Sequence, residues 1–300
     1  MKKILFLILA SYLLMNDNIY SQVGETGLAF LKTGISGRAL GMGEAYSAIA
    51  ADPSASFYNP AALSLTKNSQ LLLMHQSWIE DMKTEFIGAS VPVNRFSFGF
   101  SLNSTSISNF QLRTQPGPEL GTFSVQYAAI GLSAAYQIDP TISIGVTTKF
   151  LYEKIVAEDA SGFGFDLGAL YQTPWNFNVA LAINNLGSMN ALLRESTKLP
   201  TSIRAGIGYE MPADNLDGKL ILTSDVVTYT RENKTHLQVG AEFNYKNLFA
   251  IRTGYQTGYD AKNFSSGIGI HYSFLQLDYA YVPFRYDLGS THTISLGFEF

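Results

Sequence analysis

The sequence predicts an all-β protein, a transmembrane antiparallel β-barrel of about fourteen strands with a short N-terminal plug segment. Three observations predict this fold: alternation of apolar and polar residues, an N-terminus typical of export, and a low content of charge. The alternation is clearest in the last ten residues, THTISLGFEF, where Ile294, Leu296, Phe298 and Phe300 share one parity. A barrel wall requires such strands because one face touches lipid and the other water, although the edge of a soluble sandwich can show the same pattern. We interpret Phe298 and Phe300 as the closing signal of the barrel.

The N-terminus has the three parts of an export signal. The chain begins with the basic MKK, continues with an almost unbroken apolar run over residues 4–14, and reaches the small residue Ser21. The run is too short to span a membrane as a helix, and a buried N-terminal helix would not need the two lysines. We therefore predict a signal peptide over residues 1–21 and a location in the bacterial outer membrane. Because the chain has no cysteine, lipidation at cysteine and disulfides are excluded.

The composition fits a membrane wall built from strands. Charged residues are only 15% of the chain, whereas soluble domains have roughly 25%. No segment after the signal approaches the roughly twenty apolar residues of a membrane helix, so a membrane location requires strands. The net charge of −4, without any run of basic residues longer than a pair, excludes a nucleic-acid partner. The expected partner of the wall is outer-membrane lipid.

The predicted wall, residues 68–300, divides into alternating segments separated by turn residues. Strands are expected near residues 69–78, 84–91, 95–103, 122–137, 141–153, 162–172, 177–185, 200–210, 219–228, 235–245, 248–256, 266–274, 275–282 and 291–300. The predicted lumen positions in these strands are polar or small, for example Ser97, Ser101, Gln276, Asp278 and Glu299.

The connections between these strands are alternately short and long, as barrel geometry demands. The tight ones include Pro92-Val93-Asn94, Asp139-Pro140 and Lys246-Asn247. The longer ones are Ser104 to Gly121, Lys154 to Ser161, Leu186 to Leu199, Tyr229 to Lys234, Thr257 to Ser265 and Pro283 to Ser290. An even strand number places both ends of the wall on the side of the short turns, which we expect to be the periplasm.

The segment before the wall, residues 22–67, has a different composition. It is rich in Gly, Ala and Ser and shows little alternation. A barrel of about fourteen strands is too wide for its own side chains to fill, so its lumen is an open channel or is plugged. Small residues allow close backbone packing and glycines permit bends. We predict that this segment is a plug or partial hatch.

The same segment carries a family resemblance. The stretches RALGMGEA (38–45), ADPSA (51–55) and YNPAAL (58–63) resemble the N-terminal signature of the PorV/PorQ family, itself similar to the long-chain fatty acid transporter superfamily. The stretch LDYAYVPF (277–284) resembles the closing hairpin of that family. The resemblance implies a monomeric outer-membrane barrel of about fourteen strands. Some members serve the type IX secretion system.

The motif residues that we single out in the plug are Arg38, Gly41, Gly43, Asp52, Asn59, Pro60 and Ala61. Asn59-Pro60 and Asp52-Pro53 are turn initiators, because proline fixes φ and the Asn or Asp side chain can bond nearby backbone amides. One interpretation is that these residues cap short segments of the plug. The other is that the plug gates a passage and that the Asn59-Pro60 turn latches it to the wall.

Catalytic and metal-binding signatures are missing from the sequence. There is no G-x-S-x-G elbow, no H-E-x-x-H and no Walker A loop. The four histidines, His75, His236, His271 and His292, lie in separate predicted strands without metal-ligand spacing. We therefore predict no enzyme activity, no catalytic residues, no metal and no cofactor.

Two functions remain. The family resemblance implies a component or accessory of type IX protein secretion, which would contact apparatus subunits or exported cargo proteins through its loops. The more distant superfamily resemblance implies a conduit for small hydrophobic molecules. The polar predicted lumen disfavours a continuous apolar channel, whereas the modest loops disfavour capture of large cargo. The sequence analysis favours secretion and keeps the conduit as the alternative; a passive porin-like or purely structural barrel is a lesser possibility.

Overall fold

The computed structural model describes residues 26–78, 82–112, 121–192 and 195–300. The predicted signal peptide, residues 1–21, lies outside this range. Among the described residues, no helix has the length and apolar character needed to cross a membrane.

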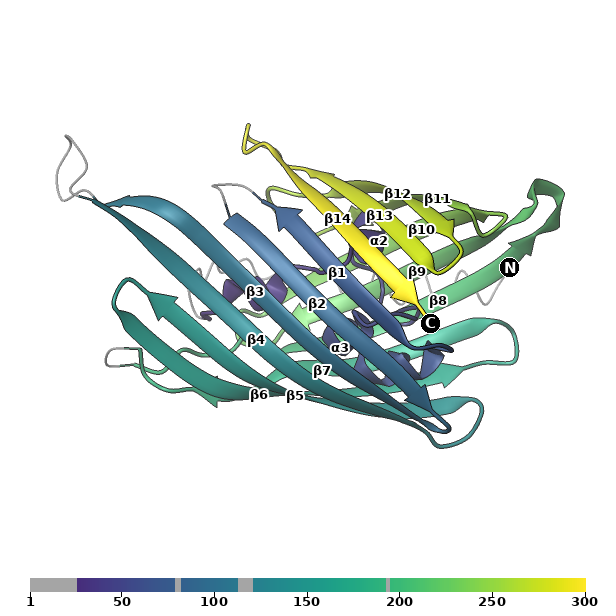
Figure 1. Cartoon of the computed structure of the whole chain (residues 1–300), viewed down its shortest axis with the longest axis horizontal. Coiled ribbons are helices and arrows are strands. Elements are labelled where there is room, and N and C mark those ends of the chain that lie inside the picture. Colours follow the sequence, from purple (N-terminus) through teal and green to yellow (C-terminus); the bar gives the residue numbers. More distant parts are fainter. Residues whose placement is uncertain (1–25, 79–81, 113–120, 193–194) are drawn as a thin grey trace.

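Fourteen antiparallel strands of the described residues form a closed barrel, which confirms the predicted fold class (Figure 1). Each strand pairs with its neighbours in the sequence, and β1 pairs with β14 to close the wall. The strands are β1 (Gln70–Ser77), β2 (Met82–Val93), β3 (Phe96–Leu112), β4 (Gly121–Gln137), β5 (Ile142–Ile155), β6 (Glu158–Gln172), β7 (Phe177–Met189), β8 (Ser202–Ala213), β9 (Gly218–Tyr229), β10 (Lys234–Tyr245), β11 (Phe249–Gln256), β12 (Phe264–Tyr272), β13 (Leu275–Pro283) and β14 (Ser290–Glu299).

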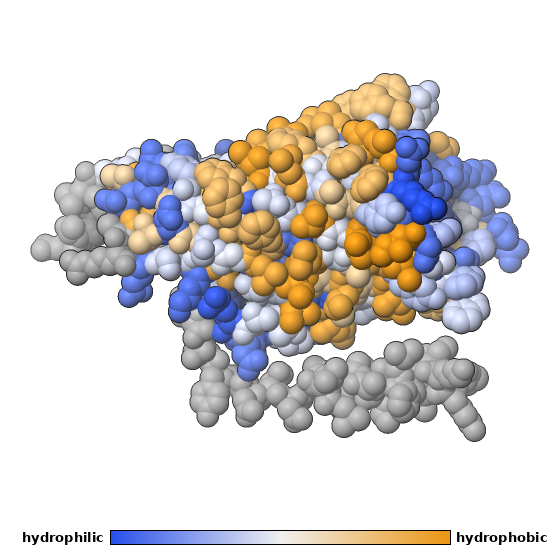
Figure 2. Space-filling model, turned by 90° about the horizontal axis from the view of Figure 1, so that it is seen from below, coloured by the Kyte–Doolittle hydropathy of each residue, from blue (hydrophilic) through white to orange (hydrophobic). Residues whose placement is uncertain are grey.

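The two faces of the wall follow the alternation of the sequence. In β3, Phe96, Phe98 and Phe100 point outward and are about half exposed, whereas Ser97 between them is buried. On the face seen in Figure 2, hydrophobic residues form a broad band across the middle of the barrel, with hydrophilic residues toward both ends. Such a band is what the hydrocarbon of a bilayer requires of a barrel surface.

The closing strand takes part in the same arrangement. Ile294 on β14 is exposed, and Phe298 shares its parity, whereas Ser295 faces inward and is buried. The backbone N–H of Phe300 donates to the carbonyl oxygen of Ser69 at 2.9 Å, just beyond the β1–β14 ladder. Phe298 and Phe300 therefore lie where the first and last strands of the wall meet.

The two ends of the barrel differ in their connections. We call the end that carries the C-terminus and the β2–β3, β10–β11 and β12–β13 turns the turn end, and the opposite end the loop end. At the turn end, Lys246 and Asn247 both have a left-handed φ, at 50° and 54°, which matches the twist of a tight hairpin. The β9–β10, β11–β12 and β13–β14 connections lie at the loop end, as the sequence predicts.

Two of the predicted long loops are wrong. Most of Ser104 to Gly121 is strand, because β3 continues to Leu112 and β4 begins at Gly121. Outside the apolar band both faces of a strand are polar, so alternation no longer marks it, although the backbone still pairs. Lys154 to Ser161 contains only a two-residue turn, in which Val156 has a φ of 59°. A β-branched residue at positive φ is uncommon, so the sequence carried no turn signal there.

The described part of the N-terminal segment, residues 26–67, lies inside the barrel and runs from the loop end to the turn end (Figure 1). It contains only short helices: η1 (Ala29–Lys32), α2 (Gly37–Gly41), α3 (Ala55–Tyr58) and η2 (Pro60–Leu65). Helix α2 packs on β11 to β14, whereas η2 packs on β3 to β6 on the opposite wall. The segment therefore bridges the lumen.

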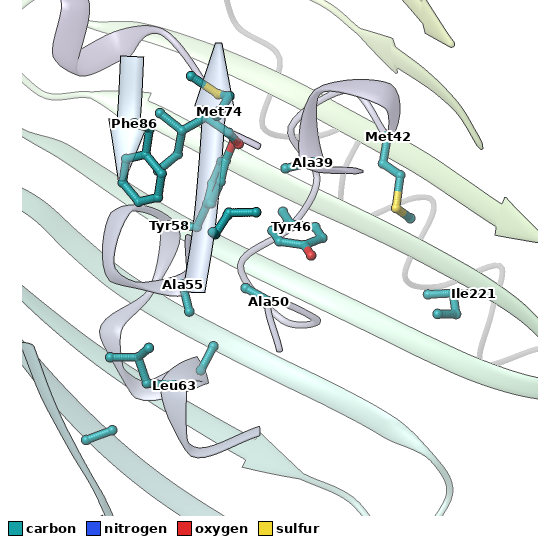
Figure 3. Packing of buried hydrophobic residues seen from close by; sticks show 14 residues of the cluster. Ala39, Met42, Tyr46, Ala50, Ala55, Tyr58, Leu63, Met74, Phe86 and Ile221 are labelled. Atoms are coloured by element: carbon teal, nitrogen blue, oxygen red, sulfur yellow. The ribbon is translucent and has the colours of Figure 1, made fainter. Parts of the chain in front are cut away.

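The core of the molecule is formed between this segment and the wall. Tyr46 and Tyr58 are fully buried and their rings meet edge to face, with 5.5 Å between the ring centroids. Met74 of β1 and Phe86 of β2 complete the cluster from the wall (Figure 3). Most other inward positions of the wall are polar, so the N-terminal segment supplies most of the apolar side chains in this core.

Candidate functional site

The first motif box, RALGMGEA (38–45), contacts the wall through its backbone. Gly240 of β10 and Gly254 of β11 are directly paired across the strands, and Met42-Gly43 lies against both of them. A Cβ atom at Gly240 would collide with the carbonyl oxygen of Met42, and one at Gly254 would collide with the Gly43 nitrogen. Gly43 itself has a φ of 65°. Glycine is required here by close backbone approach on the wall and by left-handed geometry in the segment.

The second motif box, YNPAAL (58–63), contacts a second pair of glycines. Gly145 of β5 and Gly168 of β6 are paired, and a Cβ atom on either would collide with the Asn59-Pro60-Ala61 turn. The Asn59 amide donates to the carbonyl oxygens of Ser47 and Ala169, both at 3.2 Å, and its oxygen accepts from the Ala61 N–H at 3.1 Å. The turn thus caps η2 and also bonds to the β6 backbone. Both sequence interpretations, a cap and a contact with the wall, have a bond in the structure, whereas gating stays a prediction.

Gly41 and Asp52 have different roles in the segment. Gly41 approaches the backbone of Gly267 in β12, which limits the side chain that fits there. The Asp52 carboxylate accepts from the Ser54 backbone N–H at 2.8 Å, from the Ser54 hydroxyl, and from the Tyr46 hydroxyl at 2.5 Å. Asp52 therefore organises a turn within the segment.

Arg38 joins a buried chain of charges in the wall. Its Nε and Nη2 donate to the two carboxylate oxygens of Glu242 on β10, both at 2.8 Å. Arg252 on β11 donates to the same Glu242 at 2.5 Å and to Asp278 on β13 at 2.7 Å. Bidentate and shared pairs of this kind are strong because each charge has several bonded partners. These ion pairs fix α2 to one wall of the barrel.

A second group of charges lies nearer the loop end. Arg204 on β8 donates to Asp225 on β9 at 2.9 Å and to the backbone carbonyl of Glu44 at 3.0 Å. Asp225 also accepts from the backbone N–H groups of Tyr46 and Ser47. These bonds hold the segment that follows the first box.

A cavity of about 400 Å³ opens at the loop end, above Leu40 and Glu44 of the N-terminal segment. We call it the loop-end pocket. Five aromatic side chains line it, Trp78, Tyr229, His236, Tyr259 and Phe284, together with several charged ones. The rings of His236 and Tyr259 are stacked, with centroids 3.8 Å apart, and those of Trp78 and Phe284 lie 6.0 Å apart. Cavities of this size and lining are typical of sites for small ligands.

The buried and partly buried charges around this pocket are paired, whereas two further lining residues, Lys234 and Asp260, are exposed. Lys32 donates to Glu232 at 2.5 Å, and Lys262 donates to Glu44 at 2.8 Å. Partial burial alone would raise the pKa of the Glu232 carboxyl, but the hydrogen bonds from Lys32 and Thr26 outweigh it and hold that pKa below its usual value. The Lys32–Glu232 pair ties η1 to the β9–β10 connection at the edge of the pocket.

The turn end contains a larger and more polar cavity of about 790 Å³. Arg38, Lys67, Glu210 and Lys219 are among its lining residues. Residues of the N-terminal segment line both cavities, so the segment lies between them. The barrel therefore has an aromatic pocket at one end, a polar one at the other, and a packed segment in the middle.

No motif of the sequence marks the loop-end pocket. The motifs of the sequence mark the boxes that hold the segment, whereas the pocket is formed by the N-terminal segment together with residues at the loop ends of β1, β9, β10, β13 and β14 and in the connections there. The only local signal was an aromatic residue or histidine at several of these ends, such as Tyr229, His236 and Phe284. Within the described residues, no cluster of His, Cys, Asp or Glu is arranged to hold a metal ion.

Comparisons with known proteins agree with this architecture. A family model described as "Uncharacterised protein family (UPF0164)" matches residues 19–165. A search of curated proteins gives no match. The fold is similar to the CymD monoaromatic hydrocarbon channel, with a TM-score of 0.66 and 14% identity over 89% of this chain and 98% of that one.

Two further solved structures are similar over nearly their whole length. The Pseudomonas putida toluene transporter TodX has a TM-score of 0.63 and 12% identity, covering 88% of this chain and 96% of its own. A Pseudomonas aeruginosa FadL homologue has a TM-score of 0.56 and 14% identity, covering 87% and 97%. Identities this low establish the fold alone. The chain has the closed fourteen-stranded architecture of these outer-membrane channels, which supports an outer-membrane location.

Proposed function

We propose that this protein is an outer-membrane conduit for small hydrophobic molecules, which enter through the loop-end pocket. The observation that carries the proposal is the aromatic lining of that pocket, at the mouth of a barrel whose other inward surfaces are mostly polar. An apolar molecule gains free energy by leaving water for such a surface, in proportion to the area that it buries. The printed names of two similar structures, a monoaromatic hydrocarbon channel and a toluene transporter, are consistent with this use of the fold.

The function proposed here is the conduit, whereas the sequence alone favours a role in secretion. A secretion component needs loop surface to contact proteins, yet the β5–β6 connection has only two residues and the β9–β10 connection is also short. No comparison supports a role in type IX secretion. We still propose, from the N-terminal boxes, that this protein is related to the PorV/PorQ family. We do not extend to it the secretion role that some members of that family have.

The proposal is tested by uptake of a radiolabelled alkylbenzene into cells that lack the gene. Cells complemented with the wild type should take up the label faster than cells with an empty vector. The double variant His236→Ala/Tyr259→Ala removes the stacked pair of rings and should abolish the gain. His75→Ala is the matched control, because His75 lies on the outward face of β1 and is half exposed, and it should leave uptake unchanged.

The same deletion strain discriminates the two functions. If uptake is unaffected by the deletion while exported proteins disappear from the culture medium, the conduit is wrong and secretion is right. Equal uptake by the double variant and the wild type would contradict the assignment of the pocket.

A further inference from the structure

The loop-end pocket contains two neutral polar groups without a partner. Gln76 on β1 and Thr291 on β14 both line it, and they are only 1% and 2% exposed. The Gln76 side-chain oxygen and the Thr291 hydroxyl have no hydrogen-bond partner among the described residues. The strands are adjacent, and the residue opposite Gln76 is Thr293, so Thr291 lies one inward position further along. Diagonal neighbours of this kind are roughly 7–8 Å apart, close enough for one small polar group to lie between their side chains.

These unpaired groups differ from the rest of the pocket. A buried polar atom without a partner is costly to a folded protein, so a group that binds in the pocket and bonds to it is favoured. The buried charges beside the pocket need no such partner, because Lys32 pairs with Glu232 and Lys262 pairs with Glu44. The pocket therefore lacks a neutral hydrogen-bonding partner and has no unpaired buried charge.

The chemistry of the two groups defines what would fit. A threonine hydroxyl both donates and accepts, and a glutamine amide does either according to which of its atoms faces the pocket. A ligand hydroxyl also donates and accepts, so it satisfies the pair in any of these arrangements. A carboxylate only accepts, so it cannot satisfy an acceptor that faces the pocket. Of the three lysines that line the pocket, Lys32 and Lys262 already pair with Glu232 and Glu44, and Lys234 is exposed to water. A plain hydrocarbon would leave both groups unpaired.

The aromatic walls define the remainder of the ligand. Trp78 lies just beyond the end of β1, two residues after Gln76, and its ring centroid lies 6.0 Å from that of Phe284. Val282 lies directly opposite Thr291 and is also part of the lining. An aromatic ring with a short apolar tail would meet these surfaces while its hydroxyl reached Gln76 and Thr291.

We propose that the loop-end pocket selects uncharged hydroxylated aromatic molecules, the class of the alkylphenols, through Gln76 and Thr291. This inference rests on the proposed function, because it assigns a substrate class to the same pocket. It makes the two residues specificity determinants within a site that binds apolar molecules in general.

The test uses the fluorescence of Trp78. The chain has two tryptophans, and the other, Trp175, is exposed in the β6–β7 connection at the turn end, so Trp175→Phe leaves Trp78 as the single reporter. The purified barrel is titrated in detergent with 4-propylphenol, propylbenzene and 4-propylbenzoate. We expect 4-propylphenol to bind about tenfold more tightly than the other two, the size expected for one or two net hydrogen bonds.

Variants assign this preference to the two residues. Thr291→Val and Gln76→Leu preserve shape and should bring the ratio of phenol to hydrocarbon affinity near one, with the propylbenzene affinity retained. Thr291→Ser keeps the hydroxyl and should keep the preference. Thr293→Val is the matched control, because Thr293 is equally buried and unpaired on the same strand but does not line the pocket. Heat-modifiable gel mobility verifies that each variant is folded.

The outcomes separate the inference from the proposed function. Binding of propylbenzene and 4-propylphenol with the same affinity ratio in the wild type and in Thr291→Val would overturn the inference and leave the conduit intact; water would then be the partner of both groups. Tighter binding of 4-propylbenzoate would also overturn it. Failure of all three compounds to bind would overturn the proposed function itself.

Discussion

Arg252 is the residue on which the buried charges of the wall depend most. Its side chain is fully buried, and its guanidinium bonds to two carboxylates, Glu242 on the adjacent strand β10 and Asp278 on β13, one strand beyond β12. Burying charges costs several kcal/mol per ion, so such a group is tolerated only when its partners stay in place. Arg38 adds a second cation from the N-terminal segment and balances the second carboxylate, but it bonds to Glu242 alone, which also keeps Arg252.

This difference predicts a graded series of stabilities. Arg252→Met leaves Asp278 buried beside Gln276 alone and should lower the free energy of unfolding by about 3–5 kcal/mol. Arg38→Met should cost less, because Glu242 keeps Arg252. Lys219→Met removes only the exposed pair with Glu210 and should cost below about 1 kcal/mol. Urea unfolding of the purified barrels in detergent measures all three, and equal losses for Arg252→Met and Lys219→Met would contradict the series.

At the scale of elements, the alternation of the sequence predicted every strand but not every boundary. The apolar face of β3 marks it as far as Leu102, after which STSIS carries no two-sided pattern although the strand continues. The turn at Val156 was missed for a different reason, because a valine stands where glycine or asparagine is expected. Strands were thus predictable where one face meets an apolar medium, and not where both faces are polar.

The N-terminal segment follows another rule, that of close contact between backbones. Its content of Gly, Ala and Ser predicted close backbone packing in a narrow lumen. In the structure, its motif boxes lie against glycines of the wall that are far away in the sequence. Gly240 and Gly254 face Met42-Gly43, and Gly145 and Gly168 face the Asn59 turn. These partners were not predictable, because a glycine in a strand has no sequence signal for what lies against it.

The glycine contact predicts a selective effect on the segment. Gly254→Ala places a methyl group against the backbone of Gly43, so the first box must move away from the wall. We expect the barrel to assemble normally and its N-terminal segment to be cleaved faster in limited proteolysis. Gly297→Ala is the matched control, because its methyl group would lie 3.4 Å from the Gln276 Cβ, an ordinary contact. The docking described for the first box is wrong if the two variants are cleaved at the same rate.

For the whole molecule, the sequence predicted the barrel better than it predicted the site. A wall pattern repeats along the chain and is visible locally, whereas the loop-end pocket forms only when strand ends from β1 to β14 come together. Gln76 and Thr291 are more than two hundred residues apart in the sequence and lie on adjacent strands in the structure. Neither residue has a neighbour in the sequence that marks it as part of a site.

The arrangement of charges predicts how the barrel behaves without its segment. The pairs Arg252–Glu242, Arg252–Asp278 and Arg204–Asp225 join strands of the wall to each other. The segment contributes Lys32, Arg38 and Glu44 to ion pairs with the wall and its loops. Glu242, the partner of Arg38, keeps Arg252, whereas Glu232 and Lys262, the partners of Lys32 and Glu44, lie in the β9–β10 and β11–β12 connections at the loop end. Removal of residues 27–65 therefore leaves Asp225, Glu242 and Asp278 of the wall each with a cationic partner, and the inward surface that it uncovers is mostly polar.

We expect the shortened barrel to assemble, as judged by heat-modifiable gel mobility, and to conduct several-fold more current than the intact protein in planar bilayers. If it assembles and conducts no more than the intact protein, then the segment is not the plug, and the lumen must be closed by the wall and its loops.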